Sequence, residues 1–194
     1  MTFEERYYRA LVVSSSEKFN EFIAPLLSGA RCEPITFANS ISAAKRLSLE
    51  NQYDCVIINA PLPDEQGAKY AIDVSSDKST VCLLFIKADV YAEVRSKVLP
   101  RGVFTLPKPT SAVSVTHALD FLASARERLR SLEKKALSIE EKMEEIRLVN
   151  RAKWLLIDHL KMTEPDAHRY IEKQAMDTCV TRSEVAKGII ATYL

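Results

Sequence analysis

Short apolar runs alternate with helical patterns along the first 122 residues. The runs that predict strands are RALVV (9–13), PITFA (34–38), CVIIN (55–59), VCLLFI (81–86) and VFTL (103–106). Between them, segments such as SEKFNEFIAPLL and DVYAEVRSKVL carry apolar residues at helical spacing. Ser40 and Asp89 stand where their side chains could cap two of these helices. The alternation predicts a parallel sheet covered by helices.

Five such strands with crossover helices form an α/β fold of the flavodoxin-like type. Ligand sites of that fold lie at the carboxyl ends of the strands. We therefore expect functional residues directly after the apolar runs, and residues 1–121 as the first domain.

After Pro109 the pattern changes to one long helix with an apolar seam. Its members recur at alternating spacings of three and four and are Leu122, Ala125, Leu129, Leu132, Ala136, Ile139, Met143 and Ile146, with Asn150 in the next position. Four heptads favour a coiled coil and a parallel homodimer. The alternative, a helix lying along a globular core, would show a wider apolar face. We expect a coiled-coil linker over 122–140.

The remaining stretch, 141–194, predicts a small module of three helices. EIRLVNRAKWLLIDHL continues the long helix, TEPDAHRYIEKQAMDT forms the second, and TRSEVAKGIIATYL forms the third. Thr163 is the expected cap of the second helix, and Thr181 or Ser183 of the third. The residues predicted as core are Trp154, Leu155, Leu156, Ile157 and Leu160 on the first helix, and Ala167, Tyr170, Ile171, Gln174 and Ala175 on the second.

Composition sets limits on function. The chain has 194 residues, 47% of them hydrophobic and 27% charged, with a net charge of +1, which suits a globular protein and gives no overall attraction to nucleic acid. The four cysteines show no C-x-x-C spacing, which favours a structural role over a metal or redox role. Cys55 and Cys82 lie in strand-like runs and are expected to pack as small hydrophobes. The three histidines show no metal spacing, so we expect no cofactor or metal. Without a signal peptide or a long apolar run, the expected location is the cytoplasm.

Two loops, PLPDEQG and the PKP at 107–109, make the first domain resemble the receiver domains of two-component response regulators. The resemblance places Asn59 at the phosphoacceptor position, Ser14 and Ser15 at the acidic pair, Lys87 at the hydroxyl position and Lys108 at the lysine position. Only Lys108 matches the family pattern.

These departures change the expected chemistry. The Asn59 amide is a poor nucleophile, and Ser14 and Ser15 cannot offset the charge of Mg²⁺ as carboxylates do. Asp54 precedes the strand core and Asp64 lies beyond Pro63, so neither replaces the lost site. We predict a pseudo-receiver with a basic pocket at Lys87 and Lys108, regulated by a partner protein, a ligand or a constitutive dimer.

The C-terminal module resembles the ANTAR domain. The residues that carry the resemblance are Ala152 and Lys153, Glu164 and Ala167, Ala175 and Met176, and Val185 and Ala186. Trp154 stands where the family has a small residue. The resemblance implies an RNA-binding transcription antiterminator that holds paired hairpins in a leader transcript.

Cationic residues in this module are sorted by helix face, although nine Lys or Arg stand against ten Asp or Glu between Glu140 and Leu194. The candidate RNA contacts are Arg147, Arg151, Lys153, Lys161, His168, Arg169, Lys173 and Arg182. The simpler interpretation of such pairs is a solvated surface.

Three other functions remain as alternatives. A protein-interaction scaffold would use the coiled coil as its working part and suits the neutral charge. A DNA-binding role lacks a helix-turn-helix with a basic second helix. An enzyme is not expected, because no nucleophile, acid-base pair or metal cluster is visible.

Overall fold

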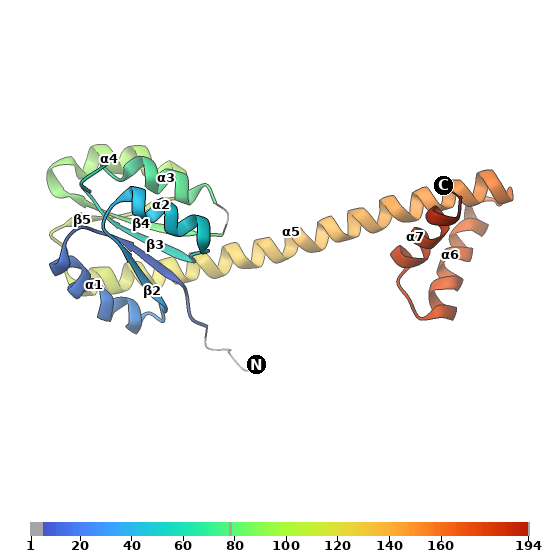
Figure 1. The fold of residues 1–194 in the computed structure, drawn as a ribbon, viewed down its shortest axis with the longest axis horizontal. Coiled ribbons are helices and arrows are strands. Elements are labelled where there is room, and N and C mark those ends of the chain that lie inside the picture. Colours follow the sequence, from blue (N-terminus) through green and yellow to red (C-terminus); the bar gives the residue numbers. More distant parts are fainter. Residues whose placement is uncertain (1–5, 78, 194) are drawn as a thin grey trace. The chain divides into compact units, whose positions relative to one another are not determined.

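The computed structural model describes residues 6–77 and 79–193. Five parallel strands form one sheet in the order β2-β1-β3-β4-β5 (Figure 1). Their bounds are β1 (Ala10–Val13), β2 (Ile35–Ala38), β3 (Cys55–Asn59), β4 (Val81–Lys87) and β5 (Phe104–Lys108). The predicted flavodoxin-like fold is therefore confirmed, with each strand near its expected range.

Alternate strand residues face two separate apolar cores. Leu11, Ile58 and Leu84 pack on the core beneath α2 (Ile41–Glu50), α3 (Ala68–Ser75) and α4 (Tyr91–Val98). Val12, Ile57 and Phe85 face the other core, beneath α1 (Glu17–Gly29) and the first part of α5 (Ala112–Leu160). Figure 1 shows the two helical layers on opposite faces of the sheet. Burial on both faces explains why the strands are continuous apolar runs.

Helix starts confirm some predicted caps and correct others. The Ser40 hydroxyl accepts from the Ala43 amide, 3.2 Å away, as predicted. Asp89 does not cap α4: it lies in a 3-10 turn, Ala88–Val90, and its carboxylate accepts from the next amide, that of Val90. The predicted position was wrong because the first turn after β4 is a tighter 3-10 turn that moves the helix start to Tyr91.

Helix α5 confirms the predicted long helix, and its first part belongs to the receiver-like unit. The chain divides into two compact units, one ending at Glu133 and the other beginning at Lys134. Leu122 is only 2% exposed and packs in the core with β1 and β3, with Ala125 and Leu129 against the same core. The receiver core thus extends beyond residue 121, and Leu122 is unavailable to an intermolecular seam.

The second unit packs the end of α5 against α6 (Glu164–Thr178) and α7 (Arg182–Tyr193). Its core contains Val149, Ala152, Leu156, Ala167, Ile171, Ala186 and Ile189. Thr163 caps α6 by accepting from the Asp166 amide. Thr181 caps α7: its hydroxyl accepts from the Glu184 amide, and the Glu184 carboxylate accepts from the Thr181 amide, which forms a capping box.

Several residues predicted as core in this unit are exposed. Trp154 is 71% exposed, and Leu160 and Tyr170 are exposed as well. The mistake for Trp154 has a geometric cause. Val149, Ala152 and Leu156 define the buried stripe of α5, and Trp154 lies about 160° around the helix from Leu156 at 100° per residue. Within 6–77 and 79–193, no helix is long and apolar enough to cross a membrane.

Candidate functional site

Three of the predicted receiver residues meet at the carboxyl end of the sheet. Ser14 directly follows β1, while Asn59 and Lys108 are the last residues of β3 and β5. Ser14 and Asn59 are buried and Lys108 is half-buried. This arrangement follows from parallel topology, because all the carboxyl ends of the strands lie at one edge.

A chain of hydrogen bonds fixes the Asn59 side chain. The Lys108 ammonium donates to the Asn59 amide oxygen, Oδ1, across 2.5 Å and also donates to the Ala60 carbonyl. The Asn59 amide nitrogen, Nδ2, donates to the Ser14 hydroxyl oxygen across 3.0 Å, and that oxygen also accepts from the Ser16 amide. Both ends of the Asn59 amide are therefore engaged, and the amide is neutral and weakly nucleophilic.

Lys87 and Lys108 give this edge a positive charge. The two residues are register partners at the ends of β4 and β5. Burial lowers the pKa of the Lys108 ammonium, and repulsion from Lys87 lowers that pKa further. The Lys87 and Ser15 residues are exposed, so the site consists of a half-buried ammonium with a second cation at its rim.

Asp54 and Asp64, the two acids closest in sequence to Asn59, make hydrogen bonds to other parts of the receiver unit. Asp64 accepts hydrogen bonds from the Ile41 and Ser42 amides at the start of α2, and the Ser42 bond is the main cause of its lowered pKa. Asp54 accepts from the guanidinium groups of Arg126 and Arg130 on α5, at 2.9 and 3.0 Å. Neither carboxylate replaces the acids missing at Ser14 and Ser15.

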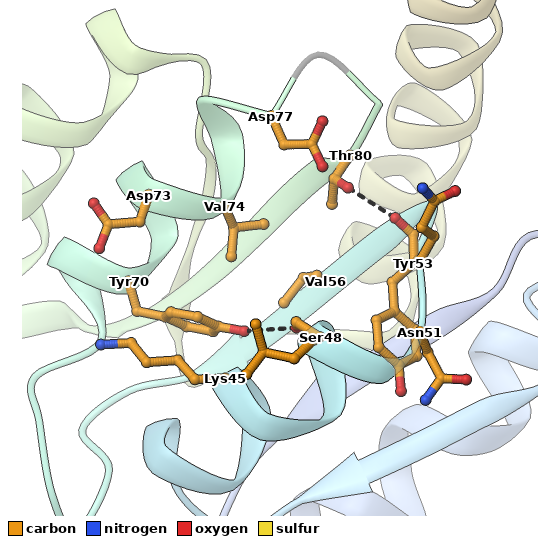
Figure 2. Close-up of a pocket in the computed structure, with 12 residues that line it drawn as sticks. Lys45, Ser48, Asn51, Tyr53, Val56, Tyr70, Asp73, Val74, Asp77 and Thr80 are labelled. Carbon is orange, nitrogen blue, oxygen red and sulfur yellow. Dashed lines mark hydrogen bonds between the residues drawn. The ribbon is translucent and has the colours of Figure 1, made fainter.

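A hollow of about 460 Å³ lies at the opposite end of the sheet, between α2 and α3 (Figure 2). Tyr53 and Thr80, which precede β3 and β4, line it together with Tyr70 of α3. Figure 2 shows the Tyr70 hydroxyl directed at Ser48 of α2, with 3.4 Å between the two oxygens. Because its lining comes from the amino ends of the strands, this hollow is separate from the Asn59 site.

A second hollow, of about 390 Å³, lies on the C-terminal unit. Its lining gathers basic side chains from all three helices, and consists of Lys142, Glu145, Ile146, Val149, Asn150, Lys153, His168 and Arg182. Three of the predicted RNA contacts, Lys153, His168 and Arg182, therefore come together. Lys142, which was not predicted as an RNA contact, is a fourth basic residue of the lining. Glu145 is the acidic residue of the lining.

Carboxylates hold the basic side chains of the hollow in position. Lys153 pairs with Glu164 at 2.7 Å, which joins α5 to the first turn of α6. Arg182 pairs with Glu145 at 2.9 Å and with Glu172 at 3.7 Å. His168 lies 3.3 Å from Glu172. These pairs fix the hollow's shape and neutralise part of its charge.

The other predicted RNA contacts lie outside this lining. Arg147, Lys161 and Arg169 are exposed and make ion pairs with acids three residues away, at 3.5 to 4.0 Å. Arg151 and Lys173 are exposed, and no described carboxylate lies within ion-pair distance of either. Exposed pairs at these distances hold their partners weakly.

Sequence reasoning missed two surface residues beside these cations. Lys142 is one, and Trp154 is the other. Arg147, Arg151 and Trp154 follow one another at spacings of four and three, the spacing of one helix face. That spacing was the available signal for an exposed aromatic among cations, but the apolar run WLLI concealed it.

Several seam residues are exposed in this single chain. Leu132, Ile139, Met143 and Ile146 are each more than half exposed. Large apolar side chains repeated along one exposed face are typical of surfaces that contact another molecule.

Comparisons with known proteins give a family match for the C-terminal part of the chain and a fold match for the N-terminal part. Residues 138–190 match the ANTAR domain family. The chain is 26% identical over 185 residues to the transcriptional regulatory protein PdtaR of Mycobacterium tuberculosis, in strains CDC 1551 and H37Rv, covering 95% of this chain and 90% of that protein.

Solved structures with the same fold include the signal receiver domain of an HD domain-containing protein from Pseudomonas fluorescens Pf-5. It has a TM-score of 0.57 and 24% identity, and the match covers 69% of this chain and 97% of that one. The chemotaxis response regulator CheY4 of Vibrio cholerae gives a TM-score of 0.52 and 18% identity, over 60% of this chain and 99% of that one. These likenesses establish a receiver fold for the N-terminal unit.

Proposed function

This chain is an ANTAR-domain response regulator, and from that premise we propose that it is a dimeric RNA-binding regulator of transcription antitermination that phosphorylation of its receiver does not control. The target would be a pair of hairpins in a leader transcript. The protein would act by binding, without an enzymatic step of its own.

The observation that carries the RNA proposal is the basic hollow on the ANTAR domain. Lys142, Lys153 and Arg182 border one concave surface with His168, and only Glu145 among the lining residues is acidic. Phosphate groups of RNA are anions that such a surface attracts, while His168 offers a ring for contact with an unstacked base. The near-neutral charge of the whole chain does not oppose this, since the cations are gathered locally.

The exposed seam supports the dimer. Ile139, Met143 and Ile146 would bury their apolar area against a second copy, in a two-stranded coiled coil. Asn150 in the next seam position favours two strands in fixed register. Two ANTAR domains held together would bind two hairpins with an effective concentration that a single domain lacks.

Binding to a two-hairpin leader RNA tests the RNA proposal. Fluorescence anisotropy would compare this RNA with a scrambled sequence and with duplex DNA across a salt series. We expect hairpin-dependent binding that weakens steeply as salt rises. Lys142→Ala combined with Lys153→Ala should weaken binding and reduce the slope of log K against log salt by about 1 to 2.

A variant with the same change of charge is the control. Lys18→Ala combined with Lys69→Ala removes two exposed lysines from the receiver unit, and binding should match the unchanged protein. Circular dichroism would establish that both double variants are folded. An equal loss of RNA affinity in the two double variants, or an affinity that does not change with salt concentration, would contradict the proposal.

The absence of phosphorylation control has its own test. Incubation with a small phosphodonor and Mg²⁺ should label no aspartate, because Asn59 is held by Lys108 and Ser14, while Asp54 and Asp64 are bound elsewhere. Mg²⁺-dependent labelling of any aspartate, detected by mass spectrometry, would refute this part.

A coiled-coil scaffold is the second candidate function. The ion pairs of Lys153, Arg182 and His168 with carboxylates favour it, since they lower the charge available to RNA. An apolar docking surface would bind a protein partner with little dependence on salt, whereas RNA binding depends on it strongly. The salt series therefore separates the two candidates.

A further inference from the structure

Two cysteines that are far apart in the sequence meet in the receiver unit. Cys32 follows α1 and Cys55 begins β3, and their sulfur atoms lie 3.8 Å apart. Both residues are buried, at 6% and 4% exposed. The Cys55 thiol is placed to donate to the Cys32 sulfur, while the Cys32 thiol is near the Ala30 carbonyl. The sequence predicted a structural role for the cysteines rather than a redox role, and it did not indicate this contact.

The other two cysteines have different surroundings. Cys82 is fully buried in the core on the opposite face of the sheet, beneath α2 to α4. Cys179 is exposed at the end of α6. Cys32 and Cys55 are therefore the pair whose sulfur atoms approach each other among the described residues.

The neighbours of the pair connect it to α5. Cys32 and Cys55 border a small space together with Leu119, Leu122 and Arg126 of that helix. Asp54, next to Cys55 in the chain, accepts hydrogen bonds from Arg126 and Arg130. The thiols thus lie beside the ion pairs between α5 and Asp54. This is the amino end of β3, whereas Asn59 is at its carboxyl end.

We propose that Cys32 and Cys55 are a modification site, at which hydrogen peroxide converts the two thiols into a disulfide. The Cys32 thiolate attacks one peroxide oxygen, which breaks the O–O bond, forms a sulfenic acid and releases hydroxide that is protonated to water. The Cys55 sulfur then attacks the Cys32 sulfur, forming the S–S bond and releasing the sulfenic oxygen as a second water. Each peroxide molecule is reduced as the two thiols are oxidised.

The pair has an asymmetry that suits this order of steps. The hydrogen bond from Cys55 lowers the pKa of the Cys32 thiol, although burial and Asp54 oppose this. The same hydrogen bond and burial raise the pKa of Cys55. Cys32 is therefore the first nucleophile and Cys55 the thiol that resolves the sulfenic acid. A disulfide so formed is reversible by thiol exchange.

Peptide mapping after peroxide treatment tests the site. The full chain carrying Cys179→Ser, which removes the exposed thiol, would be oxidised, alkylated and digested with trypsin. Cys32 and Cys55 fall in separate peptides, 32–45 and 47–69. We expect a linked pair of these two peptides, lacking two hydrogens, that dithiothreitol separates again.

Two variants make the result decisive. Cys32→Ser should abolish the linked species, whereas Cys82→Ser should leave it unchanged. In the untreated protein, iodoacetamide should modify Cys32 at least about tenfold faster than Cys82, since burial raises the pKa of the Cys82 thiol. A linked species that includes Cys82, or oxidation of Cys32 to a sulfinic acid without linkage, would overturn the proposal.

Discussion

The Lys108 ammonium lies 2.5 Å from the Asn59 amide oxygen and is its hydrogen-bond donor. In the family that this domain resembles, a carboxylate stands at the position of Asn59. Here a neutral amide accepts from the lysine and donates to Ser14. The contact between β3 and β5 thus runs through a neutral amide, which is a weaker nucleophile than a carboxylate.

Removing the Lys108 ammonium should destabilise the receiver unit. Lys108→Met leaves the Asn59 amide oxygen and the Ala60 carbonyl without their donor, and Asn59 is buried. We expect a loss of about 1 to 2 kcal/mol in the free energy of unfolding, measured by urea denaturation. Lys97→Met, on an exposed pair with Glu93, is the control and should have little effect. Equal stability of the two variants would contradict the structural role of Lys108.

The lowered pKa of Lys108 predicts a dependence of stability on pH. Between the folded pKa and the ordinary value of 10.5, the unfolded chain binds more protons than the folded chain. The free energy of unfolding should therefore rise with pH through that window. Lys87→Met removes the repulsion and should raise the pKa of Lys108, which narrows the window. Nuclear magnetic resonance titration of the lysine side chains measures the pKa of Lys108 in the unchanged protein and in Lys87→Met. The same Lys108 pKa in both proteins would refute the repulsion between the two lysines.

Asp54 should be important for attaching α5 to the sheet. Its carboxylate accepts hydrogen bonds from the guanidinium groups of Arg126 and Arg130, and Arg126 is only 7% exposed. Asp54→Asn would leave the buried Arg126 cation with the longer pair to Glu133, at 3.4 Å, as its compensation, and we expect a loss of about 2 kcal/mol in urea denaturation. Glu93→Gln, which removes an exposed pair, should cause no measurable change. If both variants unfold alike, the Asp54 pairs do not anchor the helix.

A charge in the seam should prevent dimer formation. Ile139 and Leu137 are both 59% exposed on α5, but only Ile139 belongs to the predicted seam. Ile139→Lys should give a monomer in sedimentation velocity, since lysine cannot be buried between two helices without a partner. Leu137→Lys should remain a dimer. Dissociation by both substitutions, or by neither, would exclude this seam as the interface.

Trp154 should contribute little to stability despite its size. Because it is 71% exposed, Trp154→Ala should change the free energy of unfolding by less than about 0.5 kcal/mol. Leu156→Ala, two residues away and fully buried, should cost about 3 kcal/mol. Trp154 is the single tryptophan of the chain, so its fluorescence can also be followed during RNA titration. A large loss of stability at Trp154 would show that it is buried in solution.

The sequence by itself determined the elements and their order. Strand runs such as CVIIN are apolar throughout because both faces of a parallel sheet are covered, and that requirement is visible residue by residue. The cap at Thr163 is equally local, since a helix start is satisfied by side chains within a few positions. For the last helix the sequence left Thr181 and Ser183 open, and the structure chose Thr181. The amide at Asn59, where the resemblance leads us to expect a carboxylate, is likewise visible from one residue type.

Only the tertiary structure decided which distant residues share an environment. It put Leu122 into the receiver core, brought Cys32 to Cys55, and gathered Lys142 with Lys153 and Arg182 around one hollow. It also left Trp154 exposed, because the positions of α6 and α7 determine which face of α5 is buried. Periodicity gives the faces of a helix, but contacts between elements far apart in the chain determine which face becomes the core.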